Sequence, residues 1–163
     1  MYQIKITGFL LIVFLLVGCN SSFMNSNKDV LAEKKSQASR KASISKGNKV
    51  LMTAIVTHLN DVSVMAYHNR EYFFVEIYSE EEMDYGGIIT YTLNGKSPLW
   101  VREIKSDEFD KILNPSNKWS RCYMVAFKTL SELELRNMVL TMEVSQLGKM
   151  EFDFTIKLLP LQF

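Results

Sequence analysis

An alternation of apolar and polar side chains, repeating every two residues, is the strongest constraint on the fold of this 163-residue chain. Near the end of the sequence, Met150, Phe152 and Phe154 alternate with Glu151 and Asp153. Successive side chains of a β-strand point to opposite faces of its sheet, so this pattern predicts a strand with one buried face. Comparable strand-like runs occupy residues 50–59, 62–67, 71–78, 88–93, 99–105, 121–128, 138–144 and 150–158.

Strands at this density predict a mainly β fold. We expect residues 49–163 to form an antiparallel β-sandwich, immunoglobulin-like or transthyretin-like, because two facing sheets bury one face of every strand without large helices. A small closed β-barrel is the alternative architecture. The aromatic side chains that we expect in the core are Phe73, Phe74, Trp100, Trp119, Tyr123, Phe127, Phe152 and Phe154.

Three local signals interrupt the strand pattern. Asn94-Gly95 favours positive φ in a tight turn, which predicts a hairpin between the strands on either side of it. One short helix is expected over residues 106–113, because its apolar residues recur with helical spacing. The short connection at residues 145–149 predicts a second hairpin, between the last two strands.

The charge of the chain is divided between two regions. Seven basic and two acidic residues give residues 20–49 a net charge of +5, whereas 11 basic and 16 acidic residues give residues 50–163 a net charge of −5. We predict a flexible basic tether over residues 19–48, because its charged and serine-rich composition provides few apolar side chains for a core. The acidic folded part repels phosphates, which disfavours nucleic acid as a partner.

The first 18 residues have the layout of a secretory signal peptide. Lys5 provides positive charge near the start, and an apolar run follows over residues 9–17. This run is about half as long as the ~20 residues that span a bilayer as a helix. Residues 1–18 are therefore interpreted as a signal peptide rather than as a membrane-spanning anchor.

The tetrad Leu16-Val17-Gly18-Cys19 at the end of this segment resembles the lipobox of bacterial lipoproteins. The resemblance implies that the signal peptidase recognises Leu16, Val17 and Gly18 and cuts before Cys19. It also implies that Cys19 is lipidated on its thiol and acylated at its new N-terminus, with fatty acyl chains such as palmitate. Two or more acyl chains give durable membrane attachment.

The residues that follow Cys19 bear on the choice of membrane. In enterobacterial lipoproteins, an Asp directly after the lipidated cysteine retains the protein in the inner membrane. This chain has Asn20 and Ser21 instead. The resemblance therefore implies the outer membrane, with the protein facing the periplasm, more than it implies the inner membrane.

Few side chains of the folded part form a pattern associated with chemistry. His58, His68 and Asp61 match no metal-ligand spacing, and Cys122 lies in a strand that is apolar on both faces, which predicts a buried, inert thiol. The acidic run at residues 79–84 lacks the spacing of an EF-hand and is expected in a solvated loop. We therefore expect a protein that is not an enzyme and has neither a metal nor another cofactor.

The expected function is that of a lipid-anchored cell-envelope lipoprotein, acting as a non-enzymatic interaction or assembly module. Its partners would be the membrane, through lipidated Cys19, and an envelope protein. This plan resembles that of secretion lipoproteins and pilotins, and residues 74–78 resemble the strand that such sandwiches use. The alternative is a periplasmic carrier that binds a lipid or a small hydrophobic ligand between its sheets.

Overall fold

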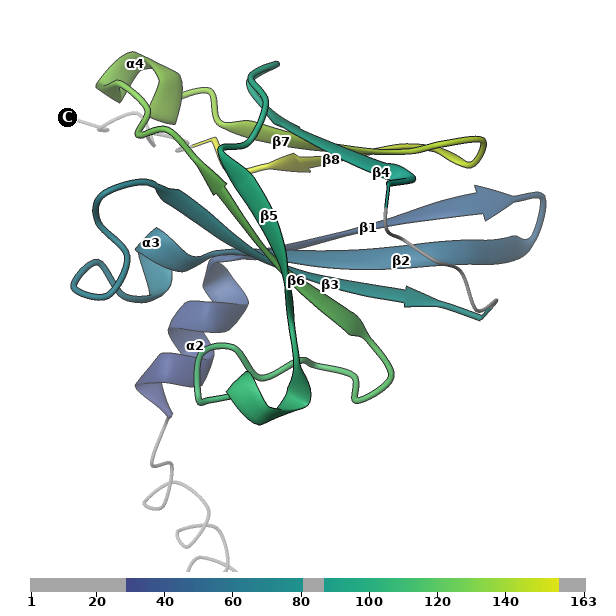
Figure 1. Cartoon of the computed structure of the whole chain (residues 1–163), viewed down its shortest axis with the longest axis horizontal. Helices are drawn as coiled ribbons and strands as arrows, with labels where there is room; N and C mark the ends of the chain where they lie inside the picture. The colour runs from purple at the N-terminus through teal and green to yellow at the C-terminus, as the bar shows by residue number, and fades with distance from the viewer. Residues whose placement is uncertain (1–28, 81–86, 156–163) are drawn as a thin grey trace, which may run out of the picture.

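Two antiparallel sheets pack face to face in a computed structural model, which describes residues 29–80 and 87–155 (Figure 1). The larger sheet has the order β1-β2-β3-β6-β5, formed by β1 Ser39–Lys46, β2 Lys49–His58, β3 Glu71–Ser79, β6 Arg121–Phe127 and β5 Trp100–Ile104. The smaller sheet has the order β4-β7-β8, formed by β4 Ile89–Leu93, β7 Val139–Val144 and β8 Gly148–Asp153. The predicted mainly β, antiparallel sandwich is confirmed, and the described strands do not close into a barrel.

The core between the two sheets is built from alternate residues, as the sequence pattern predicts. Phe73 and Val75 of β3 lie on the side of the larger sheet that faces the smaller one, which we call the inner face. Leu140 of β7 and Phe152 of β8 pack in the same cluster, and these four side chains are at most 1% exposed. The facing sheets thus bury the apolar half of each strand pattern.

The opposite, outer face of the larger sheet is buried as well. Phe74 on β3 and Met124 on β6 belong to a second apolar cluster, to which Leu113 contributes from a loop. Helix α2, Val30–Gln37, and the segment of residues 105–120 lie on this side of the larger sheet (Figure 1). The molecule therefore has three layers, with the larger sheet in the middle.

The tether predicted over residues 19–48 is wrong from residue 29 onward. Residues 30–37 form α2, and β1 pairs with β2 along its whole length, with one register shift after Ile44. Ile44 is buried in the core, but most other β1 side chains are exposed, among them Lys41. Charged side chains on an edge strand prevent unwanted pairing with other chains, which explains why this strand has a polar composition.

The helical segments also differ from expectation. Residues 62–67 form no strand: α3, Leu59–Val62, ends there and a turn follows. The helix predicted over residues 106–113 is limited to the 3-10 turn η1, Ser106–Glu108. At the end of this segment, the carboxylate of Asp110 accepts hydrogen bonds from the backbone N–H groups of Ile112 and Leu113. A further short helix, α4, spans Glu132–Leu135, where Glu134 and Ser131 form a capping box.

Asn94-Gly95 forms the predicted tight turn, but the predicted hairpin is wrong. Both residues have positive φ, 49° and 77°, and the N–H of Lys96 donates to the carbonyl of Leu93 at 2.9 Å. Asn94 is also bonded to Val139 of β7, through its own N–H and through its side-chain oxygen, each at 2.9 Å. These bonds hold β4 in the smaller sheet, while β5 pairs with β6 in the larger one.

The two sides of the sandwich are not alike. On one side, β1 approaches β8, and Arg40 Nε donates to the carbonyl of Asp153 at 2.8 Å. On the other side, β5 is the edge of the larger sheet, and no other described strand pairs with its open side. The hairpin between β7 and β8 is confirmed, with Gln146 at φ 65° in its turn.

Candidate functional site

A groove of about 590 Å³ lies on the outer side of the larger sheet. Helix α2 and the start of β1 form one wall, and the loop of residues 111–116 forms the other. This volume falls within the range of small-molecule binding sites. The side chains with polar groups that line the groove belong to Asp29, Lys35, Ser36, Ser39, Lys111, Asn114 and Ser116.

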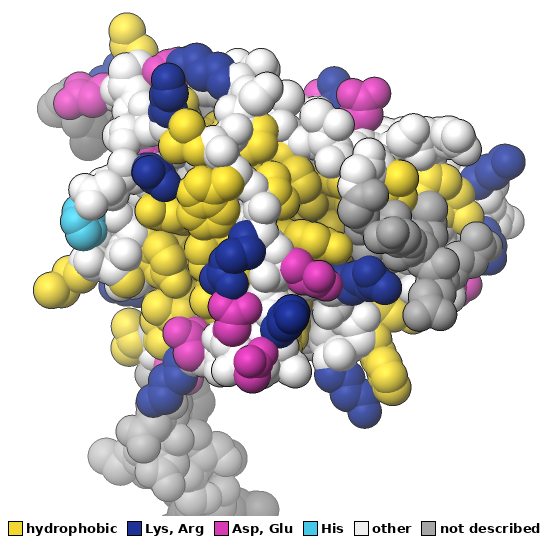
Figure 2. Space-filling model, in the orientation of Figure 1, with side chains coloured by type: hydrophobic (Ala, Val, Ile, Leu, Met, Phe, Trp, Pro, Cys, Tyr) yellow, Lys and Arg dark blue, Asp and Glu magenta, His cyan; other side chains and the backbone are white. Residues whose placement is uncertain are grey.

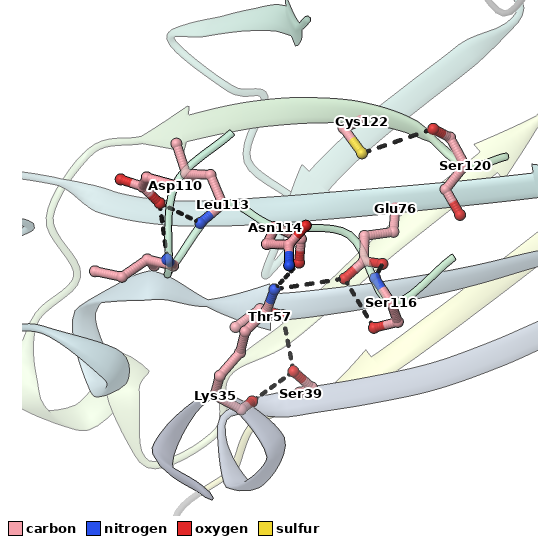
Figure 3. A network of polar contacts seen from close by, with 11 residues as sticks. Lys35, Ser39, Thr57, Glu76, Asp110, Leu113, Asn114, Ser116, Ser120 and Cys122 are labelled. Atoms are coloured by element: carbon pink, nitrogen blue, oxygen red, sulfur yellow. Dashed lines mark hydrogen bonds and ion pairs between the residues drawn. The ribbon is translucent and has the colours of Figure 1, made fainter. Parts of the chain in front are cut away.

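Glu76, a carboxylate in the middle of β3, is bonded to two residues of this lining (Figure 3). It is only 2% exposed. Ser116 donates its backbone N–H to Oε2 and its hydroxyl to Oε1, the latter at 3.4 Å. Lys35 Nζ lies 4.0 Å from Oε1 and also donates to the carbonyl of Asn114. Helix, sheet and loop thus meet at one carboxylate.

The contacts of Lys35 hold α2 against the sheet. No side chain of the helix is fully buried, so apolar packing contributes little to its position. Lys35 Nζ lies 5.1 Å from the ring centre of Phe74, which adds a cation–π contact to the ion pair. Burial lowers the pKa of Lys35, and the neighbouring Glu76 carboxylate only partly opposes this shift.

A chain of hydroxyl groups supports the end of the same helix. The Ser39 hydroxyl donates to the carbonyl of Lys35 at 2.6 Å and lies 2.8 Å from the hydroxyl of Thr57 on β2. Because Ser39 uses its proton on Lys35, Thr57 is the donor in the second bond. This connection fixes the angle between α2 and β1 at the edge of the groove.

Cys122 lies beside Glu76 in the register of β3 and β6. Its predicted burial is confirmed, since it is 1% exposed, and Sγ donates weakly to the carbonyl of Ser120 at 3.8 Å. Burial, with a further contribution from the Glu76 charge, raises the pKa of Cys122 to about 12. The thiol therefore stays protonated at neutral pH and lacks the nucleophilicity of a thiolate.

His58 occupies a second polar site, at the end of β2 on the inner face. Nε2 lies 3.1 Å from Oε2 of Glu71, and Nδ1 lies 2.9 Å from Oδ2 of Asp61 in a contact not aligned for a hydrogen bond. The other oxygen of Glu71 accepts the N–H of Leu130 at 3.2 Å. The ring also packs against Phe73, with their centres 5.0 Å apart.

The electrostatics of this site favour a protonated ring. Burial alone lowers the pKa of His58, but the carboxylates of Asp61 and Glu71 outweigh it, so the pKa is raised overall. An imidazolium carries a proton on both nitrogens, which matches one carboxylate on each side. The site joins β2, α3, β3 and the segment at Leu130, and we assign it a structural role.

The two histidines of the chain lie in different environments. His58 is buried beside Asp61, whereas His68 is exposed in the loop before β3. No group of three or more His, Cys, Asp or Glu residues able to hold a metal ion occurs in residues 29–80 and 87–155. Most of the acidic run at 79–84 and all of 16–19 lie outside the described residues.

The Lys35–Glu76 pair was missed because its partners lie 41 positions apart in the sequence. A weak signal existed in β3, where Glu76 interrupts an otherwise apolar run at a position that faces the same side as Phe74. A carboxylate at a buried strand position needs hydrogen-bonding or charged partners. Those partners come from the segment that was predicted to be a tether and from the loop that follows the predicted helix.

A second pocket, of about 160 Å³, reaches the core between the sheets. Leu93, Leu99, Phe127 and Leu130 form its apolar walls. Sites for ligands of ordinary size enclose at least about 300 Å³, so this pocket does not favour the carrier alternative. Within the described part of the chain, no helix has the length and apolar character needed to cross a membrane.

Comparison with known proteins adds no assignment. No protein-family model matches this chain, and neither a curated protein nor a solved structure matches it. The function is therefore inferred from the residues of the chain itself.

The buried ion pair can be tested with a double-mutant cycle. Lys35→Met should lower the free energy of unfolding by about 3 kcal/mol, because it leaves the Glu76 carboxylate buried without its cation. The double variant Lys35→Met/Glu76→Gln should lose less unfolding free energy than the sum of the losses of the two single variants. The difference, measured by urea denaturation, should be about 1–3 kcal/mol. The exposed Lys34→Met is the control, with an expected change below about 0.5 kcal/mol. Strictly additive effects would contradict the pairing.

The His58 site predicts a pH-dependent stability. A pKa that is higher in the folded than in the unfolded chain stabilises the fold fully below the unfolded value, about 6.5, and this stabilisation disappears as pH rises through the folded value. The difference in unfolding free energy between wild type and His58→Gln should therefore be larger at pH 6 than at pH 8.5. The exposed His68→Gln variant should show no such difference. Equal differences at both pH values for His58→Gln would refute the assignment.

Proposed function

We propose that this chain is a lipid-anchored protein of the bacterial cell envelope that acts as a non-enzymatic interaction module. The resemblance of residues 16–19 to a lipobox supports the anchor, with Cys19 as the lipidated residue. Asn20 and Ser21 support the outer membrane, facing the periplasm, as its location. The first described residue, Asp29, follows Cys19 by ten positions, so the folded domain lies close to the anchor.

The observation that favours an interaction module is the outer edge of β5, with which no other strand of the described residues pairs. Leu99 and Val101 are each 43% exposed there, and Figure 2 shows hydrophobic side chains gathered over β5 and β6. This edge also carries two exposed charged side chains, Arg102 and Glu103, whereas the other edge of the larger sheet, β1, carries three, Arg40, Lys41 and Lys46. An edge with apolar side chains and unpaired backbone groups is suited to accept a strand from another protein.

The binding strand that we propose is β5, and not residues 74–78 as expected from the sequence. Those residues belong to β3, which pairs with β2 on one side and with β6 on the other. Their backbone groups are therefore already used within the sheet. The partner that we propose is an extended segment of an envelope protein, which would add to the open side of β5 through main-chain hydrogen bonds.

The anchor is tested by the two cysteines of the chain. Wild type expressed in a bacterial host should yield a membrane-bound chain that begins at Cys19 and carries the mass of its lipid chains, measured by intact mass spectrometry. Cys19→Ala should abolish both the lipid mass and the membrane attachment. Cys122→Ala is the matched control and should keep both, because Cys122 is buried in β6. Unchanged attachment of Cys19→Ala would overturn the proposal.

The interaction edge is tested by site-specific photo-crosslinking in the native envelope. A photoreactive p-benzoylphenylalanine at Val101 on β5 should form an adduct with an envelope protein. The same group at Ser43, which is exposed on the opposite edge strand β1, should not form that adduct. Identical adducts from both positions, or none from Val101, would contradict a role for β5.

A further inference from the structure

Trp119 is displayed on the surface instead of filling the core. Its side chain is 72% exposed, which contradicts the core position that the sequence predicted. The loop around it is held by two hydrogen bonds to Asn117. The side-chain oxygen of Asn117 accepts the backbone N–H of Trp119 at 3.0 Å, and the backbone carbonyl of Asn117 accepts the N–H of Ser120 at 2.9 Å. Lys118 Nζ lies 4.9 Å from the centre of the Trp119 ring. Trp combines a large apolar body with an N–H group and is enriched at interfaces, so its display on a fixed turn points to a contact outside the chain.

This loop shares the outer layer with α2. Asp29 and Ala32 of the helix line the same groove as residues 114–116, which directly precede the Trp119 turn. Figure 1 shows α2 and the segment of residues 105–120 together on the side away from the smaller sheet. Val30, at the start of α2, is also 63% exposed. Both exposed apolar side chains therefore belong to one layer of the molecule.

The chain enters the folded domain through this same layer. Ten positions separate Asp29 from Cys19, and ten residues span at most about 35 Å when fully extended. A domain of this size has a radius of gyration of about 14 Å. When fully extended, the link is thus about as long as the domain is wide, and because it is attached at α2, the outer layer is the part of the domain next to the chain that leads to the lipidated residue (Figure 1).

We propose that the outer layer faces the bilayer that anchors the chain, with the Trp119 indole seated among the lipid headgroups. Indole and lysine side chains suit this region, because each combines an apolar body with a polar end. The inference rests on the proposed lipid anchor. It adds which face of the domain meets the membrane and which residue makes the contact.

The charges of this layer indicate what drives the contact. Four basic side chains are exposed, Lys34, Lys105, Lys111 and Lys118, and so are five acidic ones, Asp29, Glu33, Asp107, Glu108 and Asp110, so basic groups are not in excess. An excess of basic groups would be required for attraction to anionic lipids. The Trp119 contact should therefore form on zwitterionic phosphatidylcholine and depend little on salt.

The two tryptophans of the chain make the test specific. The lipidated full-length protein, purified from bacterial membranes, is placed in phosphatidylcholine vesicles that contain brominated lipids, which quench nearby tryptophan fluorescence. Trp100→Phe leaves Trp119 as the reporter, and about a twofold loss of emission is expected. Trp119→Phe leaves Trp100, which is partly buried against Tyr72, and little quenching is expected.

The outcomes separate this inference from the proposed anchor. A chain that carries no lipid by mass spectrometry would refute the anchor and, with it, the basis of the inference. A lipidated Trp100→Phe protein that brominated lipids leave unquenched, while water-soluble acrylamide quenches it, would refute only the membrane contact. If Trp100→Phe disturbs folding, the difference in quenching between wild type and Trp119→Phe reports on the same residue and should keep the same sign.

Discussion

Burial of the larger sheet on both faces is the constraint on which the rest of this structure depends. β3 runs through the middle of that sheet and contributes Phe73 to the inner face and Phe74 to the outer face. A sheet that is apolar on both sides needs a layer on each side. The smaller sheet provides one layer, and α2 together with residues 105–120 provides the other. Helix α2 belongs to the folded domain for this reason.

Glu76 gives the outer layer a defined position. Helix and loop could pack on a purely apolar face in several positions, because apolar contacts are not directional. A buried carboxylate, in contrast, requires hydrogen-bond donors at fixed positions. Lys35 from α2 and Ser116 from the loop provide these donors. A buried ion pair contributes little net stability compared with apolar packing, so we infer that its main effect is to specify where helix and loop sit.

The sequence predicted the parts of the fold whose pattern is local. The inner-face strands were found because alternation is visible within each strand. β1 was missed because Ile44 is its only fully buried strand residue and its neighbours are polar, as expected for an edge. The segment at residues 106–113 was assigned as a helix because its apolar spacing fits one, but those residues pack as a loop against the outer face.

The same distinction applies to the sites. The contact of His58 with Asp61 is local, since the two residues are three positions apart, and the sequence had already drawn attention to both residues. Glu71 was not identified as a partner, because it reaches His58 only through the register of β2 with β3. Lys35 and Glu76 meet across different layers, and Trp119 was placed in the core from its size alone. Contacts made by tertiary packing leave no local pattern to read.

The attachment of α2 also sets how the domain responds to mechanical force. Tension applied to the chain at Asp29 reaches α2 first, where the contacts of Lys35 and Ser39 join the helix to the sheet. Beyond it, the load falls on the Ser39 end of β1, at the open end of its hairpin with β2. That geometry peels the strand one residue pair at a time instead of shearing all its bonds together. The Lys35–Glu76 ion pair thus bears the load before the hydrogen bonds between β1 and β2 do, and we expect it to break first.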